Sequence, residues 1–144
     1  MFVVDTNVLV YAADESAPEH ERCHALLERW RRTSGAWYVT WGICYEFLRV
    51  VTHPRVFRRP WSSREAWSFV DALLATPSLD LLVEGERHAD VLASLIADVP
   101  QLSGNLLHDA HTAALMREHG VRTIYTRDTD FHRFPDLDVL DPLR

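Results

Sequence analysis

Acidic residues lie beside apolar residues at four places along the chain. They are Asp5 in FVVDTNVLVYA, Glu46 in CYEFLRV, Asp109 in NLLHDAHTAAL, and the pair Asp128 and Asp130 in IYTRDTDF. An ionised carboxylate is costly to bury unpaired, and close carboxylates repel one another. Mg²⁺ and Mn²⁺ take oxygen ligands and would remove that penalty. The residues are therefore predicted to form one acidic cluster that holds metal and activates water for phosphodiester hydrolysis.

Alternating apolar runs and helical patterns predict the elements that must position these acids. Strands are expected at 2–4, 37–40, 79–83, 123–126 and 137–140, with the first central and the last at an edge. Helices are expected at 6–13, 18–32, 42–51, from the Ser62/Glu65 capping box to before Pro77, at 86–98, and from Asn105 to Gly120. This alternation predicts an α/β fold: a three-layer α/β/α sandwich with a mostly parallel four- to five-stranded sheet, forming one domain over residues 1–144.

The carboxyl ends of the strands are where sites form in such sheets. Asp5 and Asp128 each follow an apolar strand and fall at that edge. Glu46 and Asp109 are expected in the first turns of helices that point at the same edge. The order of elements therefore brings the four acids together.

Composition indicates an ordinary globular chain of 144 residues, with 47% hydrophobic and 25% charged residues. The N-terminus lacks a basic region, so it does not resemble a signal peptide, and no apolar run is long enough for a membrane span. Cys23 and Cys44 are too few for a disulfide framework and are expected to be core residues. A cytoplasmic location is the expectation.

The net charge of −6 by itself disfavours a nucleic-acid partner. The charges are unevenly distributed, however, and one stretch of the chain is strongly basic. Residues 22–64 hold nine arginines against Glu28 and Glu46. A solvated helix face explains several of them. The loop HPRVFRRPW is different, since Arg55, Arg58 and Arg59 lie among aromatic residues between two prolines. These three arginines are predicted to contact an RNA backbone, because the arginine fork suits phosphate.

Taken together, DTNVLVYA, the helical Glu46, Asp109 in HDAH, and TRDTDF resemble the PIN domain over essentially the whole chain. The resemblance is closest to VapC-type toxins of bacterial type II toxin–antitoxin systems, and LRVVTHPRVF and GNLLHDAHTAALMREHG look like its actinobacterial branch. It implies an endoribonuclease that depends on Mg²⁺ or Mn²⁺. It also implies a homodimer and a cognate small antitoxin that binds over the site.

The resemblance also implies roles for individual residues. Asp5 and Asp109 are expected to be the primary metal ligands. Glu46 and Asp128 complete the four catalytic acids, with Asp128 contributing to metal binding and Asp130 auxiliary. Thr6, Asn7 and Thr126 are similar to the family's polar residues that orient the acids, although helix caps and turns would explain them equally well.

Each of the acids, taken singly, could be a turn, surface or helix-dipole residue. His108 and His111 suggest zinc, but no third histidine or cysteine pair completes a site, so they are expected at a polar rim. An aspartyl-nucleophile phosphatase is disfavoured, because Asn7 stands where its second aspartate belongs and the chain has no lysine. A non-catalytic PIN-like module that binds RNA or protein is the alternative function.

Overall fold

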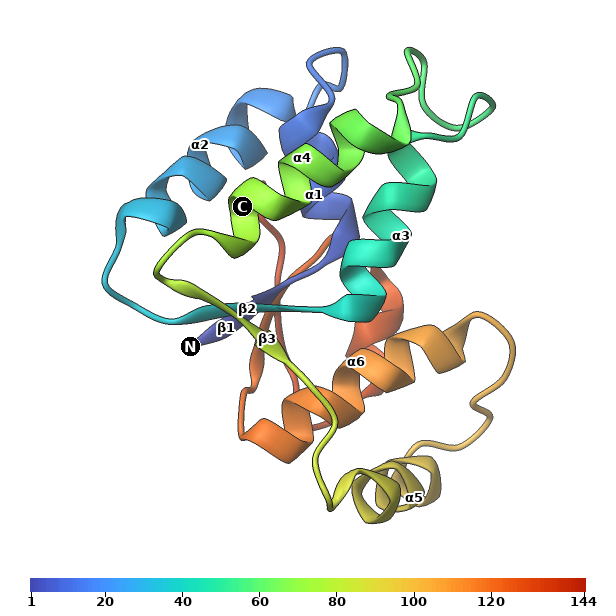
Figure 1. Ribbon diagram of the computed structural model, residues 1–144. Coiled ribbons are helices and arrows are strands. Elements are labelled where there is room, and N and C mark those ends of the chain that lie inside the picture. The colour runs from blue at the N-terminus through green and yellow to red at the C-terminus, as the bar shows by residue number, and fades with distance from the viewer.

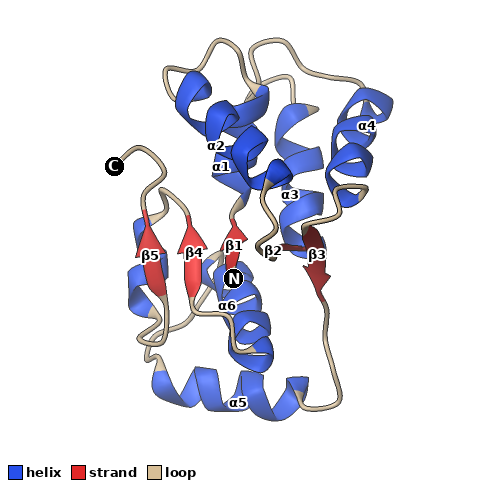
Figure 2. Cartoon of the chain, turned by 90° about the vertical axis from the view of Figure 1, so that its left-hand side faces the viewer, coloured by secondary structure: helices blue, strands red, loops and turns tan.

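The computed structural model describes residues 1–144 and contains one five-stranded sheet with helices on both faces. Its strands are β1 (Phe2–Val4), β2 (Trp37–Thr40), β3 (Leu79–Leu82), β4 (Thr123–Tyr125) and β5 (Asp138–Leu140). They lie in the order β3-β2-β1-β4-β5, and every neighbouring pair is parallel. Figure 2 shows β1, β4 and β5 side by side and pointing the same way. The predicted α/β class is confirmed, as are the central first strand and the edge position of the last.

The helices divide between the two faces of the sheet. On one side lie α1 (Thr6–Ala13), α2 (His20–Arg32), α3 (Trp41–Val51) and α4 (Ser63–Leu74); on the other lie α5 (His88–Asp98) and α6 (Leu106–His119) (Figure 1). Right-handed crossovers require this division, because the chain moves from β1 to β3 in one direction and returns to β4 in the other. The strand order therefore reverses at β1, beside β4.

A single cluster of 32 buried residues fills the space between the layers. Val3 and Val4 of β1 are fully buried, as expected of a central parallel strand covered on both faces. Cys23 and Cys44 are buried and unpaired, in agreement with their expected place in the core. None of the helices is long and apolar enough to cross a membrane.

Two expected helix ends are set by the predicted local chemistry. At the start of α4, Ser62 Oγ accepts from Glu65 N at 3.1 Å, and Glu65 Oε2 accepts from Ser62 N at 3.2 Å. At the end of α6, Gly120 adopts a left-handed conformation with φ 70°, which a residue without Cβ adopts freely.

Other boundaries differ from the prediction for identifiable reasons. The helix expected from Pro18 begins at His20, because a separate turn, closed by His20 N donating to Ala17 O at 3.0 Å, precedes it. The helix expected from residue 86 begins at His88. Gly85 N instead donates to Glu118 Oε1 at 2.8 Å, which holds this segment against α6.

Three further differences concern the site. Asn105 precedes α6 with helical φ and ψ, and its side chain makes no capping bond. Glu46 is in the second turn of α3, not the first. A short 3₁₀ helix, η1 (Thr129–Arg133), follows β4 and was not predicted. Its first turn carries Asp130, so it decides where that carboxylate lies.

Candidate active site

The candidate site lies at the carboxyl ends of β1 and β4, where the strand order reverses. Val4 of β1 pairs with Tyr125 of β4, and Asp5 N donates to Tyr125 O at 3.0 Å. Asp5 and Thr126, each the next residue after its strand, are therefore neighbours. This is the crevice that α/β sheets use for ligands.

Three donors surround the carboxylate of Asp5. Its Oδ2 accepts from Thr126 Oγ1 at 2.7 Å and from Asn7 Nδ2 at 2.8 Å, and its Oδ1 accepts from Thr6 N at 2.7 Å. Asp5 is only 9% exposed, and burial raises its pKa against the opposing effect of these hydrogen bonds. The carboxylate is thus fixed in position at an electrostatic cost.

Thr126 links this carboxylate to the next acidic segment. Its hydroxyl accepts from Asn7 Nδ2 and from Asp128 N, both at 2.9 Å, while it donates to Asp5. Asn7 Oδ1 also accepts from Arg127 N at 3.1 Å. Asn7 and Thr126 therefore determine the course of the chain into Asp128 as well as the orientation of Asp5.

The hydroxyl of Thr6 has a different role. It donates to Ile43 O at 3.3 Å and so joins α1 to α3, while only the backbone N–H of Thr6 contacts Asp5. The side chain of Thr6 thus positions Glu46 indirectly, through the helix that carries it.

Three aspartates converge in the same cleft. Asp109 in the first turn of α6, Asp128 and Asp130 each offer one carboxylate oxygen, and these oxygens all lie within 4.8 Å of one another. Asp128 Oδ1 accepts from Asp130 N at 2.9 Å, which closes the turn into η1. The structure thus brings both candidates for the last acidic position, Asp128 and Asp130, to Asp109.

Burial and the crowding of negative charge both perturb Asp109. Burial, followed by the charges of Asp128, Asp5, Asp130 and Glu46, raises its pKa to about 7. A hard divalent cation would relieve this repulsion, since carboxylate oxygens are its preferred ligands. The donor set therefore fits such an ion.

Glu46 lies on the cleft wall formed by α3 and is not among the three converging aspartates. Arg49 Nε and Nη2 donate to its two carboxylate oxygens at 3.0 and 2.6 Å. This pairing lowers the pKa of Glu46. The predicted fourth acid is therefore partly neutralised by a residue one turn further along the same helix.

The acids surround an open cleft of about 850 Å³. Among its lining residues are Asp5, Thr6, Asn7, Glu46, Arg49, Asn105, His108, Asp109, His111, Asp128 and Asp130. Arg49, Asn105 and His111 had no predicted role in binding or catalysis. The i, i+3 spacing of Glu46 and Arg49 on one helix was a usable signal for that pair.

The predicted RNA-binding arginines do not line this cleft. Arg55, Arg58 and Arg59 lie exposed in the loop between α3 and α4, and no hydrogen bond or ion pair engages their side chains. Phe57 anchors the loop in the core and packs edge-on against Trp61, with ring centroids 6.0 Å apart. The aromatic residues thus hold the loop, and the arginines are left facing solvent.

The metal-free protein is expected to lose stability as the pH rises from 5 to 7. The pKa of Asp109 is about 7 in the folded protein and near 3.8 when the chain unfolds. Between these values the folded protein keeps a proton that the unfolded chain has released, so the free energy of unfolding falls with rising pH. The raised pKa of Asp5 acts in the same direction. Melting temperatures in EDTA at pH 5 and pH 8 would measure the difference.

Two controls accompany that measurement. In the D109N variant, the melting temperature should fall less between pH 5 and pH 8. Mg²⁺ added to the wild-type protein at pH 8 should restore the melting temperature that was lost in EDTA. The lowered pKa of Glu46 costs stability only below about its ordinary 4.5, outside the tested range. A melting temperature that rises between pH 5 and pH 8 in EDTA would contradict the assigned environment of Asp109.

Fold and site together define a class of protein. The PIN domain family matches residues 2–137, and the chain belongs to that family. The chain is 41% identical over 143 residues to ribonuclease VapC43 of Mycobacterium tuberculosis, an alignment that covers 99% of this chain and 96% of the relative. It is 34% identical to ribonuclease VapC48 of the same species, with 96% and 94% covered. The chain is therefore a PIN-domain protein of the VapC type.

A solved structure supports the same fold. A chain of VapBC2 from Rickettsia felis, crystallised with a DNA fragment from the VapBC2 promoter, superimposes with a TM-score of 0.69. The two chains share 18% identity, and 96% of each is covered. At this identity the likeness concerns the fold alone.

Proposed function

We propose that this protein is a metal-dependent endoribonuclease and the toxin component of a toxin–antitoxin pair. The observation that carries the proposal is the convergence of Asp109, Asp128 and Asp130 in the cleft that the buried Asp5 also lines, within a VapC-type PIN domain. The one core of buried residues and the family match over 2–137 support a single PIN-like domain over residues 1–144.

The cofactor in this proposal is Mg²⁺ or Mn²⁺. Asp5, Asp109 and Asp128 would hold it, with Asp130 as an auxiliary that shares the space with Asp109 and Asp128. When bound, such an ion lowers the pKa of water and offsets the charge of a phosphodiester. The raised pKa values of Asp5 and Asp109 support this assignment, because both carboxyls lack a compensating positive charge.

The chain's other residues position these acids. Thr126 and Asn7 fix the rotamer of Asp5 through the hydrogen bonds at Oδ2. Glu46 is the fourth catalytic acid in this proposal. Arg49, which pairs with Glu46, places a positive charge in the cleft, and its guanidinium can bind a phosphate instead of Glu46. Positioning of this kind supplies much of the rate in phosphoryl-transfer chemistry.

RNA and a cognate small antitoxin are the proposed partners, with a homodimer as the assembly. The acidic cleft is open to solvent, so a protein partner can cover it. The cytoplasmic location expected from the sequence stays a prediction.

The proposal is tested by incubating purified protein, free of antitoxin, with total cellular RNA in Mg²⁺, Mn²⁺ or EDTA. Discrete fragments that require metal and disappear in the D5N variant are expected, and mapping their ends identifies the target. Thr126→Ser, which keeps the hydroxyl that orients Asp5, serves as the matched active control. Absence of cleavage from folded wild-type protein in either metal would favour the alternative, a non-catalytic binding module.

Neutralising Arg58 and Arg59 together is expected to weaken RNA binding without changing the fold. Both side chains are exposed, and α3, which lines the cleft through Val50, ends at Val51 just before their loop. Removing one arginine that binds a phosphate should lower the slope of log affinity against log salt by about 0.7 for single-stranded RNA. Arg122→Ala is the control, because Arg122 lies just before β4, at the amino ends of the strands, whereas the cleft lies at their carboxyl ends. Unchanged affinity at low salt would reject the loop as a binding surface.

A further inference from the structure

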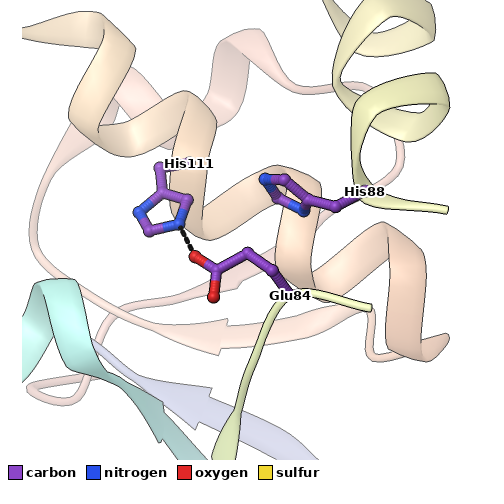
Figure 3. Close-up of side chains that lie close together, drawn as sticks. All are labelled: Glu84, His88 and His111. Atoms are coloured by element: carbon purple, nitrogen blue, oxygen red, sulfur yellow. Dashed lines mark hydrogen bonds and ion pairs between the residues drawn. The ribbon is translucent and has the colours of Figure 1, made fainter. Parts of the chain in front are cut away.

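A second group of metal-ligating side chains lies beside the cleft, outside the acidic cluster. Glu84 follows β3, His88 is the first residue of α5, and His111 is on α6. One ligand atom from each lies within 4.8 Å of the other two, and the three side chains point toward one another (Figure 3). His111 Nε2 and Glu84 Oε1 are 2.6 Å apart, and the two imidazole centroids are 5.8 Å apart.

An independent contact orients one of the imidazoles. His88 Nδ1 donates to Glu118 Oε2 at 2.9 Å. The other ring nitrogen of His88, Nε2, is therefore the one available to a ligand shared with Glu84 and His111. Glu118 is itself held, because its Oε1 accepts from Gly85 N at 2.8 Å and its side chain is only 6% exposed. A carboxylate on the second ring nitrogen is the usual way in which proteins fix a metal-binding histidine.

We propose that Glu84, His88 and His111 bind a borderline divalent cation of the Zn²⁺ type. Two imidazoles and one carboxylate form a donor set found in zinc proteins, and three protein ligands leave a coordination position for water or another oxygen ligand. The acidic cluster offers only oxygen donors, so the two groups select different metals.

The location gives this ion a structural consequence. His111 lines the cleft and stands two residues after Asp109 on α6, whereas Glu84 and His88 belong to the segment that joins β3 to α5. A bound ion would cross-link that segment to the helix that carries Asp109. The site is independent of the proposed nuclease activity and can be measured without RNA.

The experiment is calorimetric titration of the metal-free protein with Zn²⁺ in excess Mg²⁺, which occupies the acidic cluster. Wild-type protein and D109N should both bind Zn²⁺ and gain thermal stability from it. H88A and E84Q should weaken binding by at least about 100-fold. E118Q, which changes the carboxylate that holds both His88 and Gly85 N, should weaken it by about 10–100-fold. Glu84 is half exposed, so E84Q keeps the test valid if H88A fails to fold.

His24→Ala is the matched control, because His24 lies exposed on α2 near His20 and outside the group. Its Zn²⁺ affinity should equal that of the wild type. In imidazole NMR spectra, Zn²⁺ should shift the signals of His88 and His111 and leave those of His24 unchanged. Affinity that survives H88A and E84Q, or that is lost in D109N or H24A, would overturn the proposal.

Discussion

Replacing Asp109 by asparagine is expected to abolish RNA cleavage and to make the metal-free protein more stable at pH 8. Asparagine keeps the shape of the side chain and removes a charge that four other carboxylates repel. Loss of a group that helps to stabilise the charge of the transition state should lower the rate of RNA cleavage by on the order of 10³-fold. Loss of cleavage and gain of stability have one cause. The negative charge of Asp109 is needed to hold the metal, but it is unfavourable when no metal is bound.

The stability effect has its own measurement. Each kcal/mol gained at pH 8 should raise the melting temperature by roughly 2–4 °C. At pH 5 the gain should be smaller, because wild-type Asp109 is then mostly protonated. The matched control is Asp138→Asn, since Asp138 is an exposed carboxylate on the edge strand β5 and contacts none of the acids in the cleft. A D109N protein that cleaves RNA at the wild-type rate, or that melts lower in EDTA at pH 8, would refute the assignment.

Replacing Thr126 by valine is expected to destabilise the protein and to slow cleavage, although the two side chains have nearly the same shape. The hydroxyl makes three hydrogen bonds, to Asp5, Asn7 and Asp128, and Thr126 is only 1% exposed. Valine would leave a buried carboxylate short of a donor and two N–H groups without an acceptor. The expected cost is about 2–3 kcal/mol of the free energy of unfolding.

Chemical denaturation measures that cost, and the steady-state rate of RNA cleavage measures the effect on the acids. T126S restores the hydroxyl without the methyl group, so it should recover most of the activity and lose only packing. Wild-type stability and activity in T126V would mean that the hydrogen bonds of the hydroxyl are not what matters at this position.

Much of the fold follows from short-range patterns in the sequence. Apolar runs such as FVV and capping signals such as Ser62 with Glu65 act within a few residues, so the strands and the start of α4 could be predicted. The meeting of Asp5 with Thr126 was also predictable, because parallel strands bring their carboxyl ends to one edge. The helix η1 was not predicted, although the turn that Asp128 Oδ1 closes with Asp130 N is itself a short-range contact.

The remaining differences concern side-chain pairing across the fold. In the sequence His111 stands closest to His108, whereas the structure pairs it with Glu84 and His88 from another segment. That pairing depends on how α5 packs against α6, which no local pattern encodes. Likewise, the exposed arginines were recognisable by composition, but their position outside the cleft depends on the anchoring of Phe57 in the core.

The acidic residues fall into two groups, those that follow the paired strands β1 and β4 and those that lie on helices. Asp5 directly follows β1, and Asp128 follows β4 in a segment held by Thr126 and Asn7, so their separation is set by the sheet and by these hydrogen bonds. Asp109 and Glu46 are carried by helices on opposite faces, α6 and α3, which contact each other beside the cleft. A small slide of either helix changes its distance from the sheet-borne acids without disturbing the strands. If the acids hold metal as proposed, substitutions in helix packing, remote from every carboxylate, should change the metal affinity while the geometry of the sheet-borne acids stays the same.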